Sequence, residues 1–293
     1  MSEGSGQIRD KPEYPVRLLA LDVDGTILDP QSCLNADVKK ALLQALEQGI
    51  KIVLCTGRRF RRALSVAEEI GLKTPLVCNS GALVKCPESS QTLWKAEHSP
   101  NEASYLIRVF QQFDVPILSF LDSPPENPDL ITAQFPSGCE LFDDYLEKNR
   151  DFMELNPNWL EDADFHQGHF HLCAAGTIEK MNKISEHLES ERPGFYQIFV
   201  QKSPAYRVWM CEVLRRDANK WTALNAVAEQ WGIRPSEICA VGDDANDVPM
   251  IRNAGWGVAM DHSPEFVKKH AQWIAPSNVD DGVIAVVEKL IKA

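Results

Sequence analysis

Two aspartates, Asp22 and Asp24, directly follow the short apolar run of residues 18–21. Side chains along a strand alternate between its two faces, so acids at this spacing are expected where the chain leaves the sheet and forms a loop. Gly25 and Thr26 provide a turn whose backbone N–H groups can face an anion. Paired carboxylates at such a place suit phosphoryl transfer, because one can attack phosphorus while the other handles the leaving-group proton. A divalent cation would offset the repulsion between the carboxylates and a phosphate.

Other polar residues stand where further strands are expected to end or a helix to begin. They are Thr56, Gly57 and Arg58 after residues 50–55, Asn79 after residues 75–78, Asp243, Asn246 and Asp247 after residues 238–241, and Lys220 at the start of a helix. Open α/β sheets bind ligands beyond the carboxyl ends of their strands. We therefore expect these residues to meet around one site.

The elements that must position this site alternate between strand and helix. Strands are expected at 16–21, 50–55, 75–78, 238–241 and 257–259, and helices at 35–48, 59–70, 220–231, 247–253 and 282–291. This alternation predicts the α/β fold class, with a Rossmann-like parallel sheet and helices on both faces.

The alternation is interrupted between residues 84 and 207. A hairpin is expected at 82–94, helices at 101–113 and 177–191, and strands at 168–175 and 195–200, while residues 115–157 show no clear periodicity. A strand at 208–213 is expected to resume the sheet. We predict a flexible tail at 1–14, a catalytic core at 15–83 and 208–293, and an inserted α/β cap at 84–207 that sets substrate specificity, with substrate between core and cap.

Composition limits the partners. Of 293 residues, 44% are hydrophobic and 25% charged, and the formal charge is −12, which argues against nucleic acid or an anionic membrane as partner. No apolar stretch approaches the ~20 residues of a membrane span, and the first residues lack a secretory signal, so a cytoplasmic protein is expected. The eight cysteines form no CxxC pair and predict reduced thiols. A monomer or weak homodimer is expected.

Taken together, the motifs resemble those of the haloacid dehalogenase superfamily, which consists mostly of phosphatases. They are Asp22-Val-Asp24-Gly-Thr26, Thr56, Lys220 and Gly242-Asp243-Asp244-Ala245-Asn246-Asp247. Thr56-Gly57-Arg58 and Asn79-Ser80-Gly81-Ala82 resemble the Cof-type subfamily, whose larger cap enters after the third strand. The resemblance covers roughly residues 16–83 and 208–292. It implies small phosphorylated metabolites as substrates, with sugar phosphates as the leading class.

Chemistry and resemblance assign the same roles. Asp22 is the expected nucleophile that forms an aspartyl-phosphate, and Asp24 the acid that protonates the leaving oxygen and then the base that activates water. Mg²⁺ would be held by Asp22, the Asp24 carbonyl and Asp243, with Asp247 fixing a bound water. Phosphoryl oxygens would be held by the Thr56 hydroxyl, backbone N–H groups at Val23 and Gly57, Lys220 and Asn246, with Arg58 and Asn79 as possible pocket residues.

Several alternatives stay open. The same motifs fit a phosphotransferase or phosphomutase, or a ligand-sensing protein without turnover. Thr56 or Asn246 can be a helix cap, and Arg58 can pair with a carboxylate instead of substrate. Trp221 stands where Cof-type members usually carry glycine after the lysine, a departure that bears on the substrate class more than on catalysis.

Two further groups of residues favour ordinary structural roles. His166, His169 and His171 suggest a metal site, and His169 and His171 are expected to share a strand face, but no nearby cysteine completes a zinc set. A substrate-facing or ordinary polar sheet face is favoured instead. The basic run 58–62 is interpreted as a solvated helix face.

Overall fold

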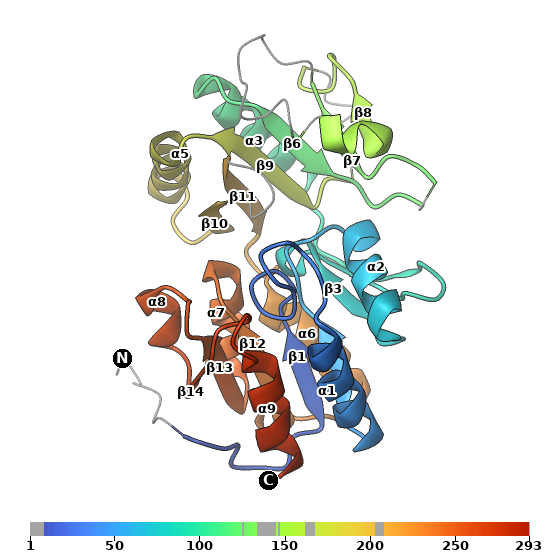
Figure 1. Cartoon of the computed structure of the whole chain (residues 1–293). Helices are drawn as coiled ribbons and strands as arrows, with labels where there is room; N and C mark the ends of the chain where they lie inside the picture. The colour runs from blue at the N-terminus through green and yellow to red at the C-terminus, as the bar shows by residue number, and fades with distance from the viewer. Residues whose placement is uncertain are drawn as a thin grey trace. The chain divides into compact units, whose positions relative to one another are not determined.

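The chain divides into two compact units. The computed structural model describes residues 9–124, 126–133, 145, 147–161, 168–202 and 208–292. The core unit comprises Met1–Trp94 and Asn219–Ala293, and the inserted unit comprises Lys95–Ala218 (Figure 1). His166 and parts of the region 115–157 lie outside the described residues.

The core unit is built on a five-stranded parallel sheet. Its strands, in spatial order, are β14 (Trp273–Ala275), β13 (Trp256–Met260), β12 (Ile238–Gly242), β1 (Leu18–Leu21) and β2 (Lys51–Leu54). β1, the central strand of the site, is fully buried. Strands buried on both faces are continuously apolar, as Leu18–Leu21 is, and the predicted α/β class with a parallel sheet is confirmed.

Helices cover both faces of this sheet (Figure 1). α1 (Ala36–Glu47) and α9 (Gly282–Ile291) contact each other on one face. On the other face, α6 (Lys220–Gln230) and α7 (Val248–Asn253) pack their apolar residues against β1 and β12. α2 (Phe60–Ile70) ends at Gly71, and a short α8 (Glu265–Lys268) precedes β14. α8 and β14 were not predicted, because both are short and their sequences show no periodicity.

The predicted hairpin extends the core unit. β3 (Leu76–Cys78), β4 (Leu83–Lys85) and β5 (Thr92–Lys95) form a three-stranded sheet, and Val77 pairs with Cys55 at the end of β2. This pairing places β4 and most of β5 in the core unit, so the unit boundary lies after Trp94 and not at the predicted 83/84. At the amino end, Arg9 also joins this unit, since its N–H donates to Gln272 O at 2.8 Å.

The inserted unit has its own mixed sheet of six strands. In spatial order these are β10 (Tyr196–Lys202), β11 (Trp209–Arg215), β9 (His171–Gly176), β6 (Ile117–Phe120), β7 (Leu130–Thr132) and β8 (Met153–Leu155). The prediction that residues 208–213 resume the core sheet is wrong, because β11 pairs antiparallel with β9 and β10. The unit therefore ends at Ala218 and not at 207.

Two helices cover one face of this second sheet. α3 (Pro100–Gln112) begins at a Ser99 capping box, and α5 (Ile178–Glu191) begins at Thr177. Their apolar residues pack with alternate residues of β6, β9 and β11, such as Ile117, Leu172 and Val213.

His169 and His171 lie on opposite faces of the sheet, so the expectation of a shared strand face is wrong. The Nδ1 atom of His169 lies 2.6 Å from Ser119 Oγ, whereas the ring of His171 contacts the ring of Phe120. Ser119 and Phe120 are consecutive in β6 and point to opposite sides. His169 precedes β9, so alternation along that strand does not extend to it.

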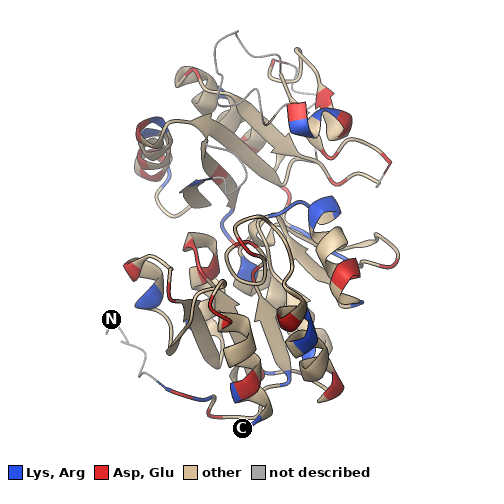
Figure 2. Cartoon of the chain, in the orientation of Figure 1, with Lys and Arg blue, Asp and Glu red and all other residues tan. Residues whose placement is uncertain are grey.

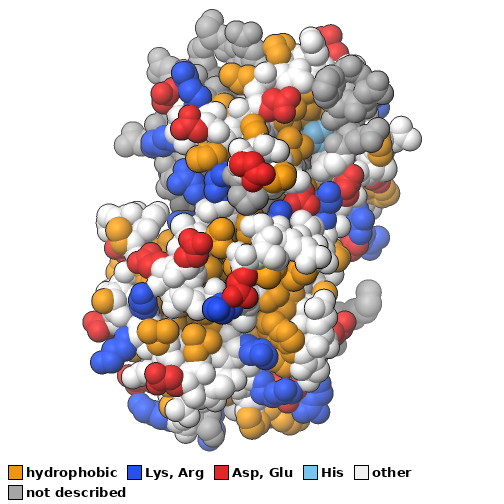
Figure 3. Space-filling view, turned by 90° about the vertical axis from the view of Figure 1, so that its right-hand side faces the viewer, with side chains coloured by type: hydrophobic (Ala, Val, Ile, Leu, Met, Phe, Trp, Pro, Cys, Tyr) orange, Lys and Arg blue, Asp and Glu red, His pale blue; other side chains and the backbone are white. Residues whose placement is uncertain are grey.

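Charged residues of both signs are distributed over each unit. Figure 2 shows acidic and basic residues interspersed on the helices. Figure 3 shows Lys and Arg side chains in several separate places on one face, with acidic and hydrophobic side chains between them. Within the basic run, Arg59 is buried and Arg62 is exposed, so the predicted solvated face applies to only part of it. In the described part of the chain, none of the helices has the length and apolar character needed to cross a bilayer.

Candidate active site

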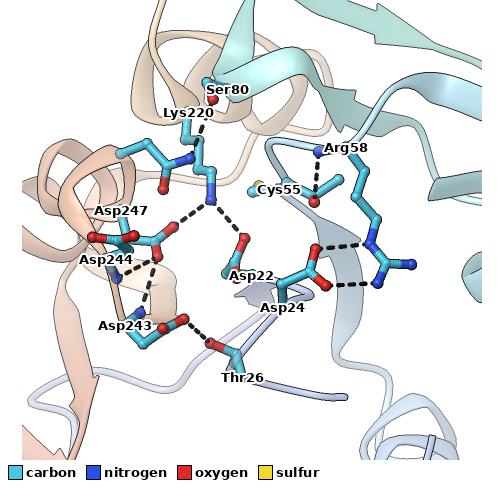
Figure 4. Close-up of polar contacts among 12 residues, drawn as sticks. Asp22, Asp24, Thr26, Cys55, Arg58, Ser80, Lys220, Asp243, Asp244 and Asp247 are labelled. Carbon is cyan, nitrogen blue, oxygen red and sulfur yellow. Dashed lines mark hydrogen bonds and ion pairs between the residues drawn. The ribbon is translucent and has the colours of Figure 1, made fainter. Parts of the chain in front are cut away.

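Asp22 and Lys220 form a buried ion pair beyond the end of β1. The Lys220 Nζ atom donates to Asp22 Oδ1 and to Asp247 Oδ1, each at 2.6 Å (Figure 4). Lys220 comes from the first turn of α6, whose Asn219 cap accepts the N–H of Thr222. Burial lowers the pKa of Lys220, but the charges of Asp22 and Asp247 raise it by more, so the ammonium form is retained.

Asp247 and Asp243 are fixed by the loop after β12. Asp247 Oδ2 accepts the backbone N–H groups of Asp243 and Asp244 at 2.9 and 3.1 Å. Thr26 Oγ1 donates to Asp243 Oδ1 at 3.2 Å. The loops after β1 and β12 meet closely at Gly25, where a Cβ would lie 2.5 Å from Asp243 Oδ2, and its φ of +77° also favours glycine.

Three of these carboxylates suit a hard divalent cation. Asp22, Asp243 and Asp247 each offer an oxygen, and the three oxygens lie within 4.8 Å of one another. Burial raises the pKa of the Asp22 carboxyl, and the nearby Asp247 and Asp243 raise it further, against the opposing effect of Lys220. The single ammonium of Lys220 therefore leaves an excess of negative charge, which a cation bound by oxygen ligands would neutralise. The residues present fit Mg²⁺.

Asp24 is bound by Arg58 and is not among these three carboxylates. Arg58 donates from Nε to Asp24 Oδ2 at 2.7 Å and from Nη2 to Oδ1 at 2.6 Å. Burial lowers the pKa of Arg58, but the hydrogen bond and charge of Asp24 raise it by more. Of the two roles left open for Arg58, the structure shows the carboxylate pair.

The candidate phosphate-binding residues lie in the same region of the core unit. Thr56 is fully buried after β2, and its Oγ1 accepts the N–H of Arg58 at 3.0 Å, as a capping hydroxyl does. The hydroxyl keeps its own hydrogen to donate. Asn246 Nδ2 donates to Ser80 Oγ at 3.2 Å, so this bond does not cap a helix. Asn79 is buried, Val23 is fully buried and Gly57 is partly exposed.

Some contacts of the site were not foreseen from the sequence. Thr26 and His262 both lie against Asp243, with His262 Nε2 at 3.6 Å from Oδ2. His262 follows β13, the parallel neighbour of β12. A polar residue at the end of another strand was therefore the sequence feature that could have identified His262. Trp221 packs against the hydrophobic cluster of the core unit.

In the part of the chain that the structure describes, His169 and His171 belong to no group suited to a metal. Among the described residues, the group suited to a metal consists of the three aspartates. His171 Nε2 instead lies 3.5 Å from Glu212 Oε2, and His169 contacts Ser119 and the ring of Trp159.

Comparison with known families agrees with this geometry. Residues 19–287 match the haloacid dehalogenase-like hydrolase family. The chain belongs to this family. The sequence-based prediction of a Cof-type haloacid dehalogenase, and with it of a hydrolase, is confirmed.

Individual relatives extend over nearly the whole chain. The phosphatase YwpJ of Bacillus subtilis (strain 168) is 28% identical, covering 94% of this chain and 100% of its own. A haloacid dehalogenase-like hydrolase structure from B. subtilis has a TM-score of 0.78 at 24% identity, covering 93% and 99% of the two chains. A haloacid dehalogenase subclass IIB sugar phosphatase has a TM-score of 0.74 at 21% identity, covering 93% and 98%. These two structures share the fold of this haloacid dehalogenase-like hydrolase.

Proposed function

We propose that this haloacid dehalogenase-like hydrolase is a Mg²⁺-dependent phosphatase of small phosphorylated metabolites, with sugar phosphates as the first class to test. The observation that carries the proposal is the meeting of Asp22, Lys220, Asp243 and Asp247 from segments far apart in sequence. The sugar phosphatase that shares the fold supports the substrate class.

In the first step, an Asp22 oxygen attacks phosphorus and the bond from phosphorus to the ester oxygen breaks. Asp24 gives its proton to the departing oxygen, which leaves as an alcohol. Lys220 and the Thr56 hydroxyl hold phosphoryl oxygens, whose charge must be stabilised in the transition state. The product of this step is an aspartyl-phosphate on Asp22.

In the second step, Asp24, now a carboxylate, takes a proton from water as the water attacks phosphorus. The bond between phosphorus and the Asp22 oxygen breaks, inorganic phosphate is released and Asp22 is regenerated as a carboxylate. The two hydrogen bonds from Arg58 hold this carboxylate in position. A bound Mg²⁺ would be held by Asp22, Asp243 and the Asp24 carbonyl, with Asp247 beside it, and would supply positive charge that keeps Asp22 ionised.

The proposal is tested by incubating the protein and Mg²⁺ with a panel of sugar phosphates, nucleoside monophosphates and p-nitrophenyl phosphate. We expect inorganic phosphate release, fastest from a sugar phosphate, and background release from Asp22→Asn. Asp37→Asn, which replaces an exposed acid at the start of α1, is the matched control and should retain full activity.

The possible results separate the parts of the proposal. No release from any ester, or unchanged release from Asp22→Asn, would contradict the phosphatase. Faster release from nucleotides would contradict only the substrate class. Transfer of phosphate to an added sugar, in place of free phosphate, would indicate a phosphotransferase.

A further inference from the structure

The three residues after β3 have an unusual backbone. Asn79, Ser80 and Gly81 all adopt left-handed conformations, with φ of 50°, 55° and 97°. This conformation is unfavourable for residues with a side chain, and Asn79 and Ser80 are also buried, with 1% and 0% exposure. Such strain persists only where the surrounding structure holds it in place, and it occurs preferentially at functional sites.

The backbone of this turn connects two segments that carry candidate site residues. The N–H groups of Asn79 and Ser80 donate to Arg58 O and Thr56 O, each at 3.0 Å. At Gly81, a Cβ would lie 2.1 Å from the Asn219 carbonyl carbon and 2.4 Å from Lys220 N. Only glycine lets the turn approach the start of α6 so closely, and the turn thereby fixes Lys220 relative to Thr56.

The side chain of Ser80 reaches a third segment. Its Oγ accepts the Asn246 Nδ2 hydrogen bond at 3.2 Å, drawn at Ser80 in Figure 4, and both residues are buried. An asparagine amide carries two donor hydrogens on Nδ2 and an acceptor at Oδ1, so the contact with Ser80 Oγ holds the Nδ2 end of the Asn246 amide and leaves a second Nδ2 hydrogen for another acceptor.

We infer that Ser80 is a positioning residue that orients the Asn246 amide for the phosphoryl group. It acts through Asn246, while the backbone of the same turn positions Lys220. The inference rests on the proposed phosphatase function and deepens it, because it identifies how phosphate-binding groups from separate segments are positioned relative to one another.

The test uses Ser80→Gly, because glycine removes the hydroxyl and tolerates the left-handed backbone. We expect a thermal midpoint no lower than that of the wild type, together with a kcat/KM on p-nitrophenyl phosphate lower by about fivefold to tenfold, the usual effect of one hydrogen bond. Ser90→Gly is the matched control, since Ser90 has a φ of 56° in the turn between β4 and β5, and its kinetics should equal those of the wild type.

A double-variant cycle distinguishes positioning from a direct role. If Ser80 acts through Asn246, adding Ser80→Gly to Asn246→Ala causes no further loss. If the losses of kcat/KM in the two single variants multiply in the double variant, or if Ser80→Gly is as active as the wild type, the inference is overturned. The proposed phosphatase function would be unaffected by either result.

A separate readout keeps the inference testable if the wild type releases no phosphate and the proposed function fails. The side-chain amide resonances of Asn246, identified by their loss in Asn246→Ala, should shift in Ser80→Gly and stay in place in Ser90→Gly. Resonances that are unchanged in Ser80→Gly would contradict the inference.

Discussion

Arg58 holds both carboxylate oxygens of Asp24, at 2.6 and 2.7 Å. The pair joins the loop after β1 to the loop after β2, which also carries Thr56. A guanidinium that binds a carboxylate through two parallel hydrogen bonds fixes the plane of the carboxylate as well as its position. The orientation of the proposed acid and base is therefore set by Arg58.

Replacing Arg58 by lysine should slow turnover by roughly tenfold to a hundredfold, part of what a positioned acid or base contributes. Lysine keeps the charge but cannot form the bidentate contact. Because a misplaced Asp24 also activates water poorly, phosphorylated Asp22 should accumulate after acid quenching and be detectable by mass spectrometry. Arg62→Lys, at an exposed position of α2, serves as the control. Normal turnover in Arg58→Lys would show that the pair does not orient Asp24.

Lys220→Met should destabilise the core unit by about 3–5 kcal/mol, because it leaves two buried carboxylates without their ammonium partner. Chemical unfolding of the metal-free protein measures this change. Added Mg²⁺ should recover part of the lost stability, since a cation can neutralise the same carboxylates. A Lys220→Met protein as stable as the wild type would contradict the importance of this ion pair for the fold.

Asp22→Asn should have the opposite effect on stability. Burial and neighbouring carboxylates raise the folded-state pKa of Asp22, so the folded protein binds more protons than the unfolded chain and loses stability as pH rises above the ordinary carboxyl value of 3.8. A neutral amide removes this loss. In metal-free buffer at neutral pH, Asp22→Asn should therefore unfold at no lower denaturant concentration than the wild type, although it is inactive. A clear decrease in its midpoint would contradict the direction of the shift.

The parts of the fold best predicted from sequence are those with strong local signals. β1 is a continuous apolar run, Asn35 caps α1, and Gly71 ends α2 in a left-handed conformation. The meeting of Asp22 with Asp243 also followed from local signals, because the parallel strands β1 and β12 bring their carboxyl ends to one edge.

What could not be predicted depends on pairing between distant segments. The sequence of β11 is compatible with a strand in either sheet. Only its pairing with β9 and β10 assigns it to the inserted unit. Short strands such as β7 and β14 offer three residues each, too few for a periodic signal. Contacts such as Asn246 with Ser80 join residues 166 positions apart, and nothing in either local sequence specifies the partner.

Thr26 and His262 should strengthen Mg²⁺ binding, because Thr26 Oγ1 donates to Asp243 Oδ1 and His262 Nε2 lies 3.6 Å from Asp243 Oδ2. Residues that orient a metal ligand commonly change affinity by about 10-fold to 100-fold when replaced. We expect Thr26→Val and His262→Gln each to raise the Mg²⁺ dissociation constant in calorimetry without substrate, and Asp243→Asn to remove binding. His270→Gln, which replaces a histidine between α8 and β14, is the control. Unchanged affinity in both variants would show that Asp243 needs no support.

Acid should destabilise the inserted unit. Burial, and to a lesser extent His98, lowers the pKa of His171 from 6.5 to about 3, and burial also lowers the pKa of His98. Below pH 6.5 the unfolded chain binds a proton at His171 that the folded unit does not. The contribution of His171 to the stability of the inserted unit is therefore constant above this pH and falls as pH decreases toward 3, by about 1.4 kcal/mol per pH unit.

His171→Gln should flatten this dependence, because glutamine keeps a donor near Glu212 and does not titrate. Urea unfolding between about pH 4 and pH 7.5 measures the slope, and hydrogen exchange of β9 and β11 peptides assigns it to the inserted unit. His187→Gln on α5, where the side chain is partly exposed, should retain the wild-type slope. If His171→Gln also retained that slope, the proton uptake on unfolding would have to come from other groups, and His171 would be charged in the folded protein.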